Sequence, residues 1–100
     1  MDNGPLSSIA AGAWDATNGT VWNDARCALS RTATGDVKVL LQIPTAEGNF
    51  AAAITQNGAP ARAYFGIVHV SDTEKHIQSI GVESPIDASF SFVFYRGSET

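Results

Sequence analysis

The chain has 100 residues, of which 44% are hydrophobic and 16% are charged, and its net charge is −4. These values predict one domain with a packed core over residues 1–100, in which residues 1–7 form a short N-terminal arm. The six Lys and Arg residues stand singly, and no apolar run approaches the length of a membrane span. We therefore expect no nucleic-acid partner and no membrane insertion.

The termini and the cysteine content bear on the compartment. Residues 1–5 show neither the basic region nor the apolar region of a signal peptide. Cys27 is the one cysteine, so no disulfide can form within the chain. Both features are typical of a protein made in a reducing compartment, and we expect synthesis in a cytoplasm.

Turn signals recur at short spacing, and the runs between them alternate apolar and polar residues, which is the strand period. This rhythm predicts an all-β fold: a single antiparallel β-sandwich, jelly-roll-like, of about seven to eight short strands. The runs that we expect to be strands are 8–16, 25–34, 36–43, 50–56, 61–70, 75–82 and 89–96.

The first run leads into a turn at Asn18-Gly19, and Trp14 and Trp22 flank that turn. The triplet Asn18-Gly19-Thr20 has the form of a glycosylation site, but we interpret it as a hairpin turn. Two interpretations of the tryptophans stay open. They form a platform on which a glycan stacks, or at least one of them belongs to the core, as large aromatic residues usually do.

The next two runs predict a hairpin that turns at Thr34-Gly35. In the run 36–43, the residues Val37, Val39, Leu41 and Ile43 share one face, whereas Leu40 stands on the opposite, polar face. Cys27 lies within a strand on an apolar face. We therefore expect a buried small hydrophobe there rather than a nucleophile.

The middle of the chain holds two further predictions. The run 50–56 is a strand, although Phe50 to Ile54 could also form a helical turn that is too short to be stable alone. The run Tyr64 to Val70 has no polar face, so it is either a central strand buried on both sides or a strand that faces another subunit.

The last run places Phe90, Phe92 and Phe94 on one face, opposite Val93 and Tyr95.

Residues suited to catalysis or metal binding are sparse. His69 and His76 match no zinc spacing, and most carboxylates stand in turns, where they usually cap backbone N–H groups. We expect no enzyme activity, no catalytic residues, no metal and no cofactor.

The order of these runs resembles the small β-sandwich domains of tailed-bacteriophage virion surface proteins, found on capsid decoration proteins, head fibres and tail-fibre tips. The resemblance covers roughly residues 8–96. It is carried by short structural motifs, which are Gly12-Ala13-Trp14, the hairpin from Ala25 to Pro44, Asn49-Phe50-Ala51 and the run Phe90 to Arg96.

The resemblance implies a non-enzymatic structural protein on the virion surface that assembles as a homotrimer. Its implied partners are the major capsid protein or another virion protein. Fibre proteins of this kind usually carry a long shaft, so the short segment before residue 8 leads us to expect a capsid-surface decoration (cement) or head-fibre protein. The alternative is a receptor- or glycan-binding tail-fibre tip that contacts a host surface glycan.

Apolar residues on otherwise polar strand faces indicate where copies would meet. A domain of this size buries only about two-thirds of its unfolded surface, so not every apolar side chain fits one core. Contiguous exposed apolar surface usually marks a contact. The residues predicted at an oligomer interface are Leu40, Tyr64, Ile67, Val93 and Tyr95.

Overall fold

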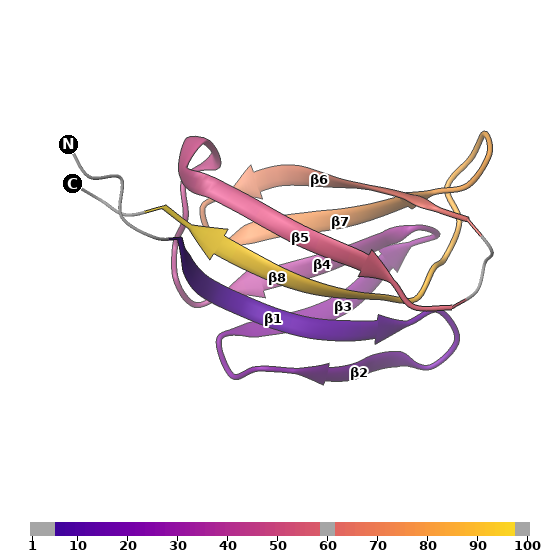
Figure 1. Ribbon diagram of the computed structural model, residues 1–100, viewed down its shortest axis with the longest axis horizontal. Coiled ribbons are helices and arrows are strands. Elements are labelled where there is room, and N and C mark those ends of the chain that lie inside the picture. The colour runs from indigo at the N-terminus through magenta and orange to yellow at the C-terminus, as the bar shows by residue number, and fades with distance from the viewer. Residues whose placement is uncertain (1–5, 59–61, 98–100) are drawn as a thin grey trace.

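The structure is a computed structural model that describes residues 6–58 and 62–97, and these residues form an all-β sandwich (Figure 1). The two layers are antiparallel sheets of four strands each, so the predicted fold class is confirmed. The strands are β1 (Ser7–Asp15), β2 (Gly19–Asn23), β3 (Cys27–Ala33), β4 (Asp36–Leu41), β5 (Phe50–Gln56), β6 (Tyr64–Ser71), β7 (Glu74–Ile80) and β8 (Phe90–Arg96), with a short 3-10 turn at Glu47–Asn49.

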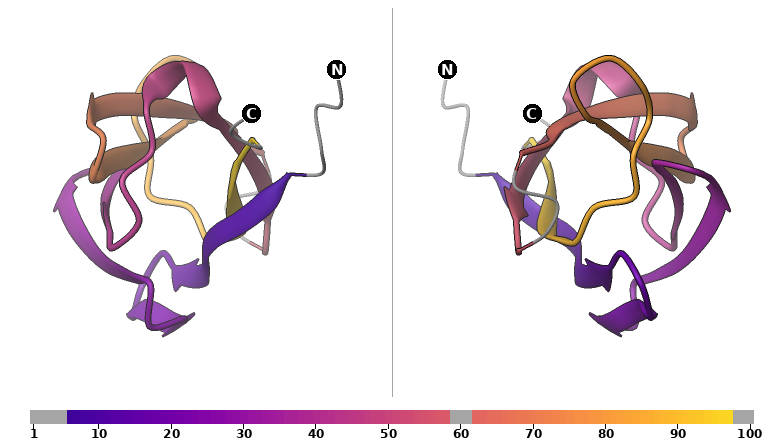
Figure 2. Two further views of the ribbon diagram at one scale, coloured as in Figure 1. Left: turned by 90° about the vertical axis from the view of Figure 1, so that its left-hand side faces the viewer. Right: turned by 90° about the vertical axis from the view of Figure 1, so that its right-hand side faces the viewer.

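The first sheet has the order β2-β1-β8-β5 and the second has the order β3-β4-β7-β6. Three hairpins, β1–β2, β3–β4 and β6–β7, stay within one sheet, and β8 inserts between β1 and β5. The end-on views show the two sheets facing each other around the core (Figure 2). The edge strands β2 and β3 lie on one side of the sandwich, which we call the closed seam. The edge strands β5 and β6 lie on the other side, which we call the open seam.

The core is built from the alternation that the sequence shows. Phe90, Phe92 and Phe94 point from β8 into the space between the sheets, where all three are buried. The rings of Phe92 and Phe94 lie 4.8 Å apart between centroids, in a tilted arrangement. The predicted inward faces of β4 and β8 are therefore confirmed. The other buried apolar members of this core cluster are Ile9, Ala10, Trp14, Cys27, Val37, Val39, Leu41 and Ile77.

Two turns depend on glycine. Gly19 (φ 87°) ends the turn between β1 and β2, where the Asp15 carboxylate accepts backbone N–H bonds from Thr17 and Asn18. Gly35 (φ 70°) turns the β3–β4 hairpin, and a Cβ there would lie 2.5 Å from the carbonyl oxygen of Ser79. Both positions need a residue that tolerates positive φ, and both were predicted as hairpin turns.

The structure shifts the ends of most predicted strands by a residue or two, and it differs from the prediction in further ways. The strand β2 was missed, because five residues after a tight turn give too short an alternation to recognise. Ser7 belongs to β1, while residues 1–5 of the predicted arm and residue 61 of the predicted sixth run lie outside the described residues. Of the two interpretations of the run Tyr64 to Val70, the central strand buried on both sides is wrong, because β6 is an edge strand whose outward residues are exposed. The other, a strand that faces another subunit, stays a prediction.

Candidate functional site

The outer face of the second sheet carries most of the exposed apolar surface that the structure describes. Side chains alternate between the faces of a strand, so the residues next to the inward ones on β4, β6 and β7 point to solvent. Of the nine large hydrophobic side chains that are exposed among the described residues, five lie here. We call these five the exposed apolar face: Leu40, Tyr64, Val68, Val70 and Ile80.

A charged histidine stands in the middle of this face. The Nδ1 of His76 lies 3.0 Å from Asp36 Oδ2, and its Nε2 lies 2.7 Å from Glu74 Oε2. Each contact needs a donor on the ring, and both nitrogens donate only in the imidazolium form. Burial lowers the pKa of His76, but the hydrogen bonds to Glu74 and Asp36 outweigh it, so the pKa is raised. This cluster ties β4 to β7.

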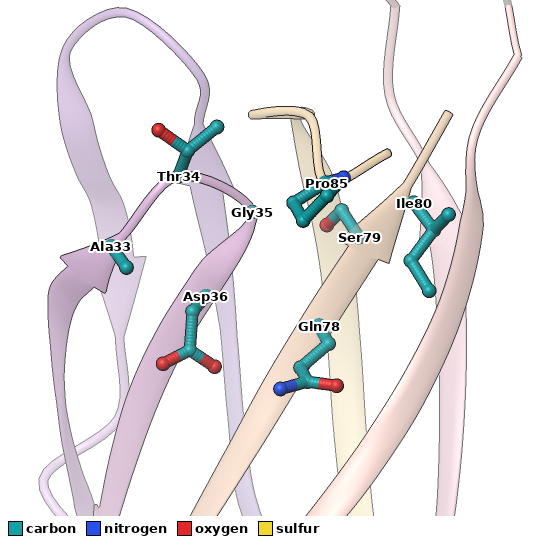
Figure 3. Close-up of a pocket in the computed structure, with 8 residues that line it drawn as sticks. All are labelled: Ala33, Thr34, Gly35, Asp36, Gln78, Ser79, Ile80 and Pro85. Carbon is teal, nitrogen blue, oxygen red and sulfur yellow. The ribbon is translucent and has the colours of Figure 1, made fainter. Parts of the chain in front are cut away.

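Asp36 also borders a small hollow of about 290 Å³ between the β3–β4 turn and Pro85 (Figure 3). Its Oδ2 accepts the hydroxyl of Thr32 as well as the His76 ring, whereas its Oδ1 is buried without a hydrogen-bond partner. Burial raises the pKa of Asp36, but the hydrogen bonds from Thr32 and His76 outweigh this effect, so the pKa is lowered overall. The carboxylate is thus an ionised acceptor. Two hydroxyl side chains, Thr34 and Ser79, also line the hollow, but the described contacts of Asp36 run to Thr32 and His76, and the Thr34 hydroxyl accepts from Arg31 instead.

Lys75 is fully buried and points between the sheets. Its Nζ lies 2.6 Å from the carbonyl oxygen of Thr45, 3.0 Å from that of Ser71 and 2.7 Å from Nδ1 of His69. Three acceptors match the three N–H groups of an ammonium. The ring of Phe50 in β5 lies 5.2 Å from the same nitrogen. Burial lowers the pKa of Lys75. The amine joins the β4–β5 connection to the end of β6, and so holds one end of the open seam.

Between its ends, the open seam is an apolar groove of about 450 Å³. Ile54 of β5 and Phe65 and Ile67 of β6 line it, and all three are only partly buried although they point toward the core. No hydrogen-bonded ladder joins β5 to β6, so both are edge strands on this side of the sandwich. Neither strand contains Lys, Arg, Asp, Glu or Pro, the residues that usually protect an edge.

The predicted interface residues do not form one surface. Leu40 and Tyr64 (61% exposed) lie on the exposed apolar face. Ile67 points the other way, where it packs against the core and lines the groove of the open seam, so it is not part of the exposed apolar face and its place in an interface stays a prediction. Val93 and Tyr95 are half-buried on β8, on the outer face of the opposite sheet. The run Tyr64 to Val70 alternates after all, since an edge strand has one face on the core and one in solvent.

The predicted pair of tryptophans is also divided. Trp14 is 7% exposed and belongs to the core, so its prediction as a glycan contact is wrong, and the second interpretation of the pair applies to it. Trp22 is 51% exposed on β2 and stays available to a ligand. The two rings separate because Ala13, not Trp14, pairs with Trp22 across the β1–β2 hairpin, and neighbouring residues point to opposite faces.

Cys27 and the histidines occupy three different environments. Cys27 is buried at the closed seam, as predicted, where its thiol faces the carbonyl oxygen of Ala11 and the carboxylate of Asp24. Burial, followed by the Asp24 charge, raises the pKa of Cys27 to about 11. His69 and His76 contact Lys75 and the two carboxylates instead. In the described part of the chain, no thiol–imidazole contact forms.

Sequence reasoning missed Lys75, Val68, Val70 and Ile80. A signal for Lys75 was available, since it stands two residues before Ile77 in the predicted strand 75–82 and so shares its inward face. The exposure of Val68 and Val70 had no such signal. An apolar run at an edge and one at the centre of a sheet look alike until the strand order is known.

Comparisons with family models, curated proteins and solved structures give no match to this chain. Among residues 6–58 and 62–97, no cluster of three or more His, Cys, Asp or Glu side chains could hold a metal ion. The same residues include no helix that is long and apolar enough to cross a membrane.

Proposed function

We propose that this protein is a non-enzymatic structural protein of a bacteriophage virion, a capsid-surface decoration (cement) or short head-fibre protein that acts as an oligomer. The observation that carries the proposal is the exposed apolar face beside the uncharged edge of β6. Surface of this kind is costly in an isolated soluble domain and is usually covered in an assembly. The phage context rests on the resemblance of the strand order and its motifs.

The side chains that could in principle take part in catalysis support a structural role. His76 is held between two carboxylates, Lys75 is enclosed by three acceptors, and the thiol of Cys27 is buried. Each of these groups has its hydrogen-bonding capacity directed at the protein itself. A reactive group needs access to a substrate and a partner that activates it. These arrangements stabilise the sandwich instead.

The proposal is tested on purified particles of the phage that encodes the chain. An antibody against the protein should label the capsid surface, and quantitative mass spectrometry should find many copies per particle. Tyr64→Glu should reduce incorporation into particles, because it places a charge on the exposed apolar face. The matched control, Val21→Glu, lies at an equally exposed position on β2 of the other sheet and should be incorporated normally. Absence of the protein from particles would overturn the proposal.

One observation favours the alternative, a receptor- or glycan-binding tail-fibre tip. Trp22 presents an exposed aromatic ring on the outer side of β2, and sugar C–H faces stack on such rings. Under this alternative, Trp22→Ala should abolish binding to a glycan array, while Val21→Ala, at the adjacent exposed position, should retain it. Labelling at a fibre tip, in few copies per particle, would favour this function.

A further inference from the structure

Gly66 stands in the middle of β6 without any need for glycine within one copy of the chain. It is not among the glycines with positive φ in the described residues, and a Cβ built on it would meet no atom within 4 Å. Glycine weakens a strand, because it adds flexibility and offers no side chain to pack. Inside a strand it often marks the place where another backbone or ligand approaches closely. Gly66 therefore indicates a contact that one copy does not contain.

The strand around Gly66 is suited to pairing with another strand. β6 has eight residues, and its side away from β7 has no ladder. It carries no Lys, Arg, Asp or Glu, although the chain as a whole has a net charge of −4. Two copies that meet along this edge would place no carboxylate opposite another, whereas a strongly charged partner would find no counterion on it. The charge distribution favours a second copy of this chain.

We infer that β6 pairs antiparallel with β6 of a second copy about a two-fold axis at Ile67, so that the second sheets of both copies form one continuous sheet. This inference rests on the proposed function, and it names a second copy of the chain as the partner at the uncharged edge of β6. In this register Val68 of each copy lies directly opposite Gly66 of the other, and Tyr64 lies opposite Val70. The space beside Gly66 takes the exposed Val68 side chain, and Tyr64 gains a β-branched neighbour.

An edge pair is a small interface. Eight residues extend about 26 Å at ~3.3 Å each, and a contact about one sheet thickness deep, ~10 Å, stays well below the ~800 Å² per copy of a stable complex. We therefore expect dissociation constants in the micromolar range or weaker in solution. On a crowded particle surface the effective concentration is far higher, so the pair would form there. A two-fold pair also closes with two copies, in place of the three that the resemblance implies.

The first experiment is sedimentation equilibrium of the full chain between about 1 and 500 µM. We expect a monomer–dimer equilibrium that Gly66→Glu weakens at least tenfold, because the new carboxylates of the two copies would lie diagonally across the two-fold axis, next to the apolar Val68 side chains. Gly48→Glu is the matched control, since Gly48 also has no atom within 4 Å of its Cβ position but lies outside β6. It should associate like the unmodified chain. Circular dichroism and the melting temperature establish that both variants fold.

The second experiment tests the register. In the double variant Gly66→Cys with Val68→Cys, each new cysteine lies opposite its counterpart, so mild oxidation should give a covalent dimer. Each single variant should give much less, because identical positions are offset by two residues. A dimer that Gly66→Glu leaves unchanged, or a trimer, would overturn the β6 pairing while leaving the proposed function intact. A chain that stays monomeric at every concentration would also overturn the pairing. Absence of the protein from phage particles would overturn the proposed function, but it would not bear on the β6 pairing in solution.

Discussion

The closed seam and the open seam join the same two sheets in different ways. At the closed seam a three-residue link, 24–26, bonds to the strands around it. Arg26 donates to the carbonyl oxygen and hydroxyl of Ser8 and pairs with Asp24, and its own carbonyl accepts the N–H of Gln42. Asn23 donates to Cys27 as well. At the open seam, Lys75 holds one end and a bond from Ala63 to Gln56 holds the other, with the apolar groove between them.

Under the proposed pairing, this difference would let one small sandwich separate folding from assembly. At the closed seam the polar groups of the link bond within the chain, although β2 and β3 are edge strands as well. The open seam leaves two backbone edges and part of the apolar core exposed. A sandwich that closed both sides with hydrogen bonds would resist edge-to-edge contact. We therefore expect changes at the closed seam to alter stability alone, and changes at the open seam to alter stability and association differently.

The largest loss of stability should come from replacing Lys75, whose hydrogen bonds hold one end of the open seam. Lys75→Ala removes the amine and leaves the carbonyl oxygens of Thr45 and Ser71 without their donor, in addition to a cavity. We expect a loss of about 3 kcal/mol in the free energy of unfolding, measured by urea denaturation. Lys75→Met keeps most of the volume and should lose about 2 kcal/mol. If both variants lose less than about 0.5 kcal/mol, Lys75 does not hold the seam.

The second prediction concerns the thiol at the closed seam. A pKa of about 11, against 9.0 for a free thiol, leaves about 100-fold less thiolate at pH 8. Cys27 should therefore react with a thiol reagent at least 100-fold more slowly in the native protein than in denaturant, where burial is lost. Because the closed seam has no role in our proposed pairing, the rate should not change with protein concentration. Reaction at the rate of a free thiol would show that this seam opens readily.

The third prediction compares one glycine on each side of the molecule. A Cβ at Gly12, next to the closed seam, would lie 2.9 Å from a ring carbon of Phe92 and 3.0 Å from the carbonyl oxygen of Trp22. Gly12→Ala should destabilise the fold by about 1–3 kcal/mol. Gly66→Ala meets nothing and should stabilise the isolated chain by about 0.5–1 kcal/mol. Thermal unfolding at low protein concentration measures both. Changes of the same sign would contradict the contrast between the seams.

The smallest effect concerns the charged cluster on the exposed apolar face. The folded pKa of His76 is raised above 6.5, so its contribution is fully present below that pH and is lost as the pH rises through the folded pKa. The folded pKa of Asp36 is lowered, so its contribution persists above about pH 3.8 and is lost as the pH falls. His76→Gln should therefore cost about 1 kcal/mol near pH 5 and less near pH 9. A cost that is equal at both pH values would contradict the charged state of His76.

Much of the fold could be predicted from the sequence because the signals are local. The alternation of Phe90, Phe92 and Phe94, and that of Val37, Val39 and Leu41, determined which side chains enter the core. The turn residues Asn18-Gly19 and Thr34-Gly35 located two hairpins. The position of Cys27 within a strand determined its burial. In each case, the geometry of one strand or one turn dictates the outcome, and no distant residue is needed.

Only the tertiary structure decided which strands lie at the edges and which side chains meet. The run Tyr64 to Val70 is apolar throughout, and its exposure depends on β7 being its one neighbour. Leu40 of β4 and Tyr64 of β6 come to lie on one outer face because β7 joins their strands in the same sheet. Lys75 meets Thr45 and His69, which come from other parts of the chain, and Val93 and Tyr64 come to lie on opposite sheets. Strand order is a property of long-range pairing, so it is not encoded in the period of any single run.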